Sequence, residues 1–149
     1  MKSPERIQLV RLEDIDGFQH ADDTYWYRPL IFSERLFTYV AHIPPAGEMP
    51  AHEDAHEFDT VLYMLNGELD ITLGREHFPI GPNMALHIPG GIPFGVKNNG
   101  AITASYVLTF NPPPEIESLE ALRERFQEKG ALIKTPSEMN EMVGGSLDR

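Results

Sequence analysis

The sequence predicts an all-β fold, a sandwich or barrel, followed by one α-helix. Short apolar runs recur along the chain, and most of the 13 Pro and 12 Gly residues lie between them, as turn residues lie between the strands of sandwiches and barrels. Several runs alternate apolar and polar residues, which is typical of half-buried strands. After Pro114 the apolar spacing becomes helical, which predicts the helix.

The first part of the chain contains two predicted strands. Residues 7–12 are predicted to form the first, and residues 17–23 are polar and turn-like. Residues 36–43 are rich in aromatic and β-branched residues and predict a second strand. That strand is expected to stop at Pro44, because proline cannot donate to a β-ladder.

The central part predicts a series of strands. Residues 60–65 are apolar on both faces, so this strand is expected to lie between two layers or to face a second subunit. Asn66-Gly67 predicts a hairpin, since both positions of a type I′ turn need positive φ. In residues 68–73 apolar and polar residues alternate, which predicts a further strand. Further strands are predicted at residues 76–80, 84–88, 92–97 and 102–110.

The last part is expected to be helical. Leu119, Leu122 and Phe126 recur at helical spacing within residues 117–129, and Gly130 is suited to end that helix. The tail, residues 142–149, is expected to be disordered. No second domain is visible, so residues 1–149 are expected to form one domain with its barrel at about 30–111.

The composition argues against several classes of binding partner. The formal net charge is −11 and no basic cluster exists, which argues against nucleic acids and anionic membranes. No apolar run reaches the roughly 18 residues that would span a bilayer. The chain has no cysteine and its start lacks the apolar stretch of a secretory signal. We therefore expect a cytoplasmic protein.

Three potential metal ligands lie close together at His52, Asp54 and His56. In a strand, His52 and His56 would be about 13 Å apart, so only neighbouring pairs about 6.6 Å apart could share an ion. In a helical turn the two histidines would lie within about 6 Å. The segment is either a solvated loop or a metal site.

Residues 47–98 resemble the two conserved motifs of the cupin superfamily. The closing glycine of the first motif falls on Gly67, which places Thr60 at the usual glutamate, His56 at the second histidine and Asp54 at the first. In the second motif the Pro, Gly and Asn positions match, the last at Asn98, whereas Phe94 replaces the histidine.

The resemblance implies a cupin double-stranded β-helix, a jelly-roll barrel with a C-terminal helix. Of the four usual ligand positions only His56 keeps the family residue; Asp54 can still coordinate, Thr60 is a poor ligand and Phe94 is none. His87 could supply an imidazole from another place. The predicted metal ligands are His52, Asp54, His56 and His87, and His56 is also the predicted catalytic residue. The predicted substrate pocket contains Thr60, Met64, Phe94, Asn98 and Tyr106.

Two functions are predicted. One is a metal-dependent enzyme of the dioxygenase, decarboxylase, isomerase or lyase type, which holds Fe, Mn, Ni or Zn and acts on a small molecule. The alternative is a metal-free small-molecule binder or metal-independent enzyme, and a structural or regulatory barrel without a site is a third hypothesis. A homodimer is expected, because the two-faced strand at 60–65 and the aromatic-rich segment at 25–39 need more cover than one small barrel supplies.

Overall fold

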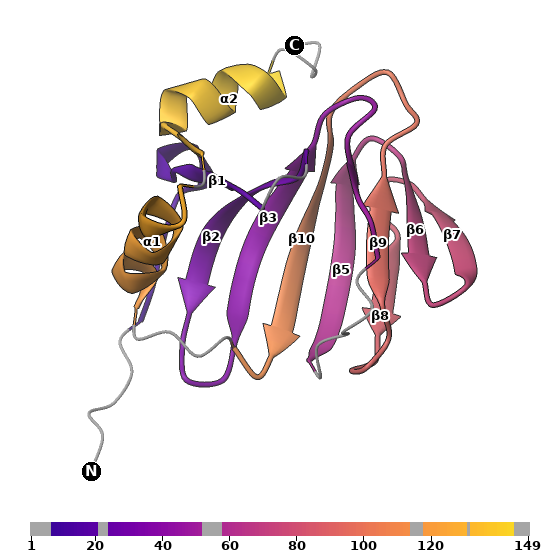
Figure 1. Ribbon diagram of the computed structural model, residues 1–149, viewed down its shortest axis with the longest axis horizontal. Helices are drawn as coiled ribbons and strands as arrows, with labels where there is room; N and C mark the ends of the chain where they lie inside the picture. Colours follow the sequence, from indigo (N-terminus) through magenta and orange to yellow (C-terminus); the bar gives the residue numbers. More distant parts are fainter. Residues whose placement is uncertain (1–6, 21–23, 52–57, 114–117, 131, 145–149) are drawn as a thin grey trace.

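The chain folds mainly as β-strands in two antiparallel sheets, as the computed structural model shows (Figure 1). The structure describes residues 7–20, 24–51, 58–113, 118–130 and 132–144. The strands are β1 (Gly17–Gln19), β2 (Trp26–Phe32), β3 (Phe37–Ile43), β4 (Glu48–Met49), β5 (Asp59–Asn66), β6 (Leu69–Leu73), β7 (Glu76–Ile80), β8 (Ala85–Ile88), β9 (Phe94–Lys97), β10 (Ala104–Asn111) and β11 (Ile133–Lys134). The helical elements are the 3-10 turn η1 (Leu12–Asp14) and the α-helices α1 (Leu119–Glu128) and α2 (Pro136–Gly144).

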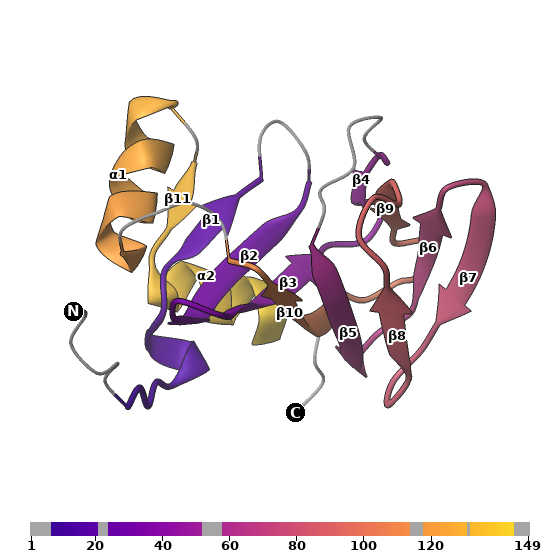
Figure 2. The ribbon, with the colours of Figure 1, turned by 90° about the horizontal axis from the view of Figure 1, so that it is seen from below.

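The two sheets enclose a common core. Seven strands form one sheet, in the order β11-β1-β2-β3-β10-β5-β8, and four form the other, in the order β4-β9-β6-β7. Buried Leu62 and Met64 of β5 and Tyr106 of β10 belong to the same apolar cluster as Leu69 and Ile71 of β6. Two antiparallel sheets around a shared core are the jelly-roll barrel that the sequence predicts (Figure 2).

Most predicted strands are confirmed. The predictions at residues 36–43, 60–65, 68–73, 76–80, 84–88, 92–97 and 102–110 correspond to β3, β5, β6, β7, β8, β9 and β10. The strand predicted at 7–12 is wrong, because residues 7–11 pair with no described strand and the chain enters η1 at Leu12. Residues 17–19, predicted as turn, form β1. Residues 142–144, predicted as disordered tail, belong to α2.

The strand at 60–65 has only one covered face. In β5, Leu62 and Met64 are fully buried, whereas Val61, Tyr63 and Leu65 are exposed on the outer face. The expectation that this strand lies between two layers of one protomer is therefore wrong. The alternative, that its outer face meets a second subunit, stays a prediction.

The hairpin predicted at Asn66-Gly67 is also wrong, because the chain there crosses from one sheet to the other. Gly67 does have positive φ, +78°, and a Cβ on it would lie 2.6 Å from the Cα of Ala104. Glycine is therefore required by a close crossing against β10 rather than by a two-residue turn. The tight hairpin is instead β6–β7, where Leu73 pairs with Glu76 and Gly74 has a φ of +60°.

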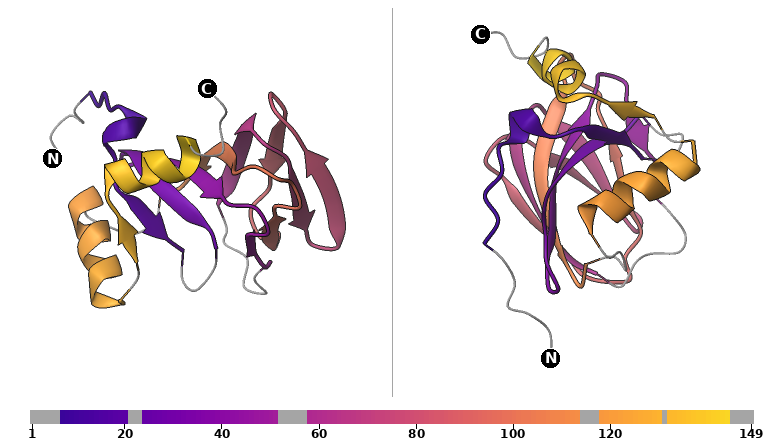
Figure 3. Two further views of the ribbon diagram at one scale, coloured as in Figure 1. Left: turned by 90° about the horizontal axis from the view of Figure 1, so that it is seen from above. Right: turned by 90° about the vertical axis from the view of Figure 1, so that its left-hand side faces the viewer.

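The C-terminal helices pack against the part of the seven-stranded sheet that continues beyond the barrel. The prediction of α1 is confirmed, and its N-cap Ser118 accepts a hydrogen bond from the backbone N–H of Ala121. Phe126 of α1 stacks on Phe18 of β1, with ring centroids 5.3 Å apart. Figure 3 shows α1 and α2 at the end of the molecule away from β6 and β7. No helix within the described residues is both long and apolar enough to cross a membrane.

η1 and α2 cover the outer face of the wide sheet at β2 and β3. The guanidinium of buried Arg28 donates to Nε2 of His42, to the carbonyl of Leu12 in η1 and to Oδ1 of Asn140 in α2. Nδ1 of His42 lies 2.8 Å from Oγ of Ser105. Because Nε2 accepts, Nδ1 carries the proton and His42 is neutral. Burial lowers the pKa of His42 to about 3, and the charge of Arg28 adds to that effect.

Replacement of Gly67 by alanine should destabilise the protein far more than the same change at Gly74. Both residues have positive φ, which costs a residue with a Cβ about 1–2 kcal/mol. Only at Gly67 would the new methyl group also clash with β10, since nothing lies within 4 Å of a Cβ at Gly74. Chemical denaturation should give losses of about 2–4 kcal/mol for Gly67→Ala and about 1 kcal/mol for Gly74→Ala. Equal losses would contradict the close crossing.

The free energy of unfolding should fall as the pH drops from about 6.5 to about 3, partly because of His42. In this window the unfolded chain binds a proton at His42 and the folded chain does not, so stability is lost on acidification with a slope of up to about 1.4 kcal/mol per pH unit. His42→Gln should reduce this slope, whereas Asn140→Ala should lower stability at every pH and keep the slope. Denaturation curves of the three proteins at several pH values test this, and an unchanged slope in His42→Gln would refute it.

Candidate functional site

The inner face of the barrel is sealed at one end and reached by solvent at the other. Ala104 and Tyr106, at the start of β10, are fully buried, whereas Phe110 near its end is half-buried. Thr60 of β5, which pairs with Phe110, and Phe94 at the start of β9 are half-buried too. We call this end, where β10 ends and β5 and β9 begin, the mouth; it is the lower end of the barrel in Figure 1.

Three tyrosine hydroxyls meet inside the barrel. Tyr39 of β3 and Tyr106 of β10 belong to neighbouring strands, and Tyr25 lies just before β2. The hydroxyl of Tyr25 is 2.9 Å from that of Tyr39 and also hydrogen-bonds to that of Tyr106. Tyr39 is the half-buried member, and its ring packs edge-to-face against Phe110 at the mouth. We call Tyr25, Tyr39 and Tyr106 the phenol cluster.

The phenol cluster is uncharged at physiological pH. Burial raises the pKa of Tyr25 and Tyr106 well above the ordinary value, and raises the pKa of Tyr39 to about 12. A phenolate formed on one ring would also be repelled by charge on its neighbours. The three hydroxyls therefore act as hydrogen-bond donors and acceptors and do not release protons to solvent.

The phenol cluster has one more donor than it uses. Each hydroxyl carries a single hydrogen, so three hydrogens are available, and the three oxygens are joined by two hydrogen bonds. Among the described residues no other group bonds to these hydroxyls. One phenolic hydrogen is therefore left over, although each of the three oxygens has a hydrogen-bond partner. An acceptor atom on a bound molecule would satisfy it.

The predicted pocket residues divide between the two ends of the barrel. Thr60 and Phe94 lie at the mouth, and Met64 and Tyr106 pair deeper on the inner face and are fully buried. Asn98 lies at the sealed end. Its side-chain amide donates to the carbonyls of Ile43 and Ile102, and its Oδ1 accepts from the N–H of Gly100. Both donors of Asn98 hold the chain in place, so this residue has no hydrogen to offer a ligand.

Three of the predicted metal ligands, His52, Asp54 and His56, lie outside the described residues. His87 lies on the outer face of β8, with its side chain 63% exposed and Nε2 3.6 Å from Oδ1 of Asp59. Its neighbours Leu86 and Ile88 face the core instead. The structure thus does not bring His87 to the barrel interior. The described residues contain no group of three or more His, Asp or Glu that could hold a metal ion.

Sequence reasoning missed Tyr25 and Tyr39 as site residues. The aromatic-rich segment around them is expected from the sequence to need cover from a second subunit. Tyr27 and Tyr39, whose ring centroids lie 4.8 Å apart, instead pack inside the same chain. The alternation of Tyr25 with Tyr27, and of Phe37 with Tyr39, is a signal that could have placed these rings on the inner face.

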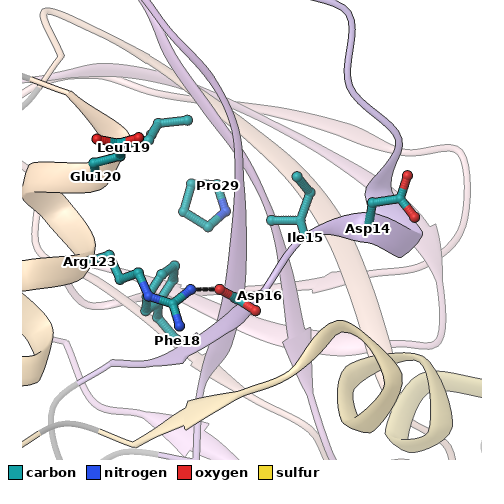
Figure 4. Close-up of a pocket in the computed structure, with 8 residues that line it drawn as sticks. All are labelled: Asp14, Ile15, Asp16, Phe18, Pro29, Leu119, Glu120 and Arg123. Atoms are coloured by element: carbon teal, nitrogen blue, oxygen red, sulfur yellow. Dashed lines mark ion pairs between the residues drawn. The ribbon is translucent and has the colours of Figure 1, made fainter.

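A surface groove of about 230 Å³ lies outside the barrel, between α1 and the η1–β1 segment (Figure 4). It is lined by Asp14, Ile15, Asp16, Phe18, Pro29, Leu119, Glu120 and Arg123. Arg123 forms an ion pair with Asp16 there. The groove is smaller than most ligand sites, which measure roughly 300–1,000 Å³, and its only described cation is already paired. We take the barrel interior as the candidate site, because the phenol cluster lies there.

Several solved structures share this fold. The TT1209 protein of Thermus thermophilus is 26% identical, with a TM-score of 0.60 over 72% of this chain and 100% of that one. The polyketide cyclase RemF from Streptomyces resistomycificus is 24% identical, with a TM-score of 0.63 over 82% and 94%. A predicted oxalate decarboxylase from Thermotoga maritima is 14% identical, with a TM-score of 0.62 over 69% and 97%. No curated protein matches the sequence significantly.

The family match covers the barrel itself. The model of the cupin domain matches residues 39–110, which run from β3 to β10. This range contains Tyr39 and Tyr106 of the phenol cluster but not Tyr25. Together with the shared architecture, the match shows that residues 39–110 form a cupin domain.

Proposed function

We propose that this cupin binds a small organic molecule, which enters through the mouth and offers a hydrogen-bond acceptor to the phenol cluster. The observation that carries the proposal is the phenolic hydrogen without an acceptor among the described residues. When Tyr106 donates to Tyr25 and Tyr25 donates to Tyr39, this hydrogen belongs to half-buried Tyr39. Since burial keeps these phenols protonated, the donor is available throughout the physiological pH range.

The surroundings favour a ligand that is uncharged and largely apolar. Phe94, Phe110 and Tyr39 line the mouth, and Phe58 stacks on Phe110 with centroids 5.1 Å apart. Arg28, the only Asp, Glu, Lys or Arg fully buried among the described residues, belongs to the outer face. A planar molecule that carries a carbonyl group fits aromatic walls and a single donor. Similarity in fold to a polyketide cyclase supports an organic ligand without specifying a reaction.

The phenol cluster would bind and orient such a molecule. A neutral hydroxyl that donates to a carbonyl oxygen draws electron density toward that oxygen and fixes the position of the group. The raised pKa values mean that the cluster holds its protons during this interaction. Binding, orientation and polarisation are therefore the roles that these three residues can perform.

The metal-dependent enzyme stays a second candidate. Ala51 lies against Gly95 of β9, and Phe58 stacks on Phe110 of β10, so the described residues on both sides of 52–57 contact barrel strands. His52, Asp54 and His56 are the predicted ligands of this candidate. Since the described residues alone provide no metal site, no step proposed here passes through an ion. The cytoplasmic location also stays a prediction.

Removal of the three hydroxyls should weaken binding of a carbonyl ligand selectively. The probe is acetophenone, compared with ethylbenzene, which has a similar shape but no acceptor. In the triple variant Tyr25→Phe, Tyr39→Phe and Tyr106→Phe, acetophenone should bind about 3–10-fold more weakly than in the wild type, the range expected for one lost hydrogen bond. Ethylbenzene should bind equally well or better. NMR titration of both proteins with both probes measures this.

The matched control is Tyr27→Phe. Tyr27 is a buried neighbour that lies outside the phenol cluster, so this variant should bind both probes as the wild type does. The triple variant should fold, because hydroxyls that bond mainly to one another are removed together; circular dichroism checks this. An equal effect of the triple variant on both probes would contradict the proposal, as would the absence of acetophenone binding to the wild type.

The metal-dependent candidate makes a separate prediction. Protein purified without an affinity tag should contain about one equivalent of Fe, Mn, Ni or Zn, and His56→Ala should lower that content severalfold because an imidazole ligand is lost. Elemental analysis measures both. His87→Ala is the comparison, because its side chain lies on the outer face. A wild-type protein that binds none of these ions on titration would remove this candidate and leave the phenol-cluster proposal standing.

A further inference from the structure

The groove between α1 and the η1–β1 segment has an apolar floor. Buried Phe18 of β1 and Pro29 of β2 line it, and half-buried Ile15 and Leu119 flank them. The volume of the groove is about 230 Å³. Since a water molecule occupies about 30 Å³ of the liquid, this volume has room for a molecule of about seven non-hydrogen atoms.

The charged side chains that line the groove do not balance. Three carboxylates and one guanidinium give it a formal charge of −2, from Asp14, Asp16, Glu120 and Arg123. Arg123 forms an ion pair with Asp16. No described residue forms an ion pair or a side-chain hydrogen bond with Asp14 or Glu120, and both are exposed. The groove therefore keeps two negative charges that the described part of the chain does not pair.

The two remaining carboxylates belong to opposite walls of the groove. Glu120 lies in the first turn of α1, and Asp14 lies in η1. Figure 4 shows Pro29, part of the apolar floor, between these two residues. The groove thus presents one negative charge on each wall and apolar surface between them.

This arrangement selects the class of ligand. An anion would be repelled by the carboxylates and by the net charge of −11. A monoamine could pair with only one of the two walls. A diamine carries an ammonium group at each end of an alkyl chain at neutral pH, because the pKa of an alkylamine is about 10. Its charges are complementary to the two walls, and its methylene groups are complementary to the floor.

We propose that this groove is a binding site for an aliphatic diamine with about four to six carbon atoms, the length that its volume admits. One ammonium group pairs with Glu120 and the other with Asp14, while the alkyl chain lies on Pro29. The bound diamine thereby joins α1 to η1. The groove lies outside the barrel and contains no residue of the phenol cluster, so this inference does not rest on the proposed function.

NMR titration of the full-length protein with 1,5-diaminopentane tests the site. Backbone amide signals of η1, β1 and the first turn of α1 should shift and reach saturation. Pentylamine has the same chain with one charge, and it should bind about 2–5-fold more weakly, the range expected for one exposed ion pair. 1,5-Pentanediol, which has no charge, should bind more weakly still. Added salt should weaken the diamine more than the diol.

Charge-removing variants test the two contacts. Asp14→Asn and Glu120→Gln should each lower the affinity for the diamine by about 2–5-fold, to the level of pentylamine on the wild type. Glu128→Gln is the matched control, because Glu128 is an exposed acid of α1 that does not line the groove. It removes the same charge and should bind the diamine as the wild type does. Circular dichroism checks that each variant folds.

Three results would overturn the proposal. The first is the absence of saturable shifts around the groove. The second is equal affinity of the wild type for the diamine and for pentylamine. The third is an equal loss of affinity in Glu128→Gln and in Glu120→Gln, because that result would mean that the diamine is attracted only by the overall negative charge of the protein.

Discussion

A sheet that is wider than the sheet it faces needs further cover for its apolar side chains. Here seven strands face only four, and the arrangement of the rest of the chain follows from that difference. At β1 and β2 the inner face is covered by α1, through Phe126 on Phe18. At β2 and β3 the outer face is covered by η1 and α2, through the hydrogen bonds of Arg28. At β5 and β8 the outer face keeps its apolar side chains in solvent.

The same geometry sets the chemistry of the interior. Because β3 and β10 are neighbours, their inner side chains Tyr39 and Tyr106 lie close together, and Tyr25 is brought to them at the start of β2. Burial raises the pKa of each phenol, and the hydroxyls satisfy one another through two hydrogen bonds. Three hydroxyls joined by two hydrogen bonds use two of their three hydrogens, and the third has no acceptor among them. The resulting site is uncharged, and it can donate one hydrogen bond in a fixed direction to a bound molecule.

Local features of the sequence are enough to predict β3 and β5–β10. These features are aromatic and β-branched composition for β3, short apolar runs between turn residues for strands such as β5, and period-two alternation for β6 and β10. The sequence predictions are wrong where a contact with a distant part of the chain determines the local backbone conformation. Residues 7–12 have strand composition but no neighbouring strand among the described residues, and Gly67 has positive φ because β10 passes beside it. Within the site, Tyr106 was predicted from the alternation of β10. Tyr25 and Tyr39 were not, because Tyr25 joins Tyr106 across a separation of 81 positions and Tyr39 bonds to Tyr25.

Buried polar groups in this protein concentrate where the wide sheet is covered on both faces. Ser105 and Tyr106 are consecutive in β10 and point to opposite sides: Ser105 bonds to His42 beneath α2, and Tyr106 bonds to Tyr25 inside the barrel. In β3, His42 and Tyr39 divide between the two faces in the same way. A hydrogen bond can hold such groups without water only where neighbouring elements exclude solvent from both sides. The outer face of β5 lacks that second cover, and Val61, Tyr63 and Leu65 lie exposed there beside the exposed pair of Asp59 and His87.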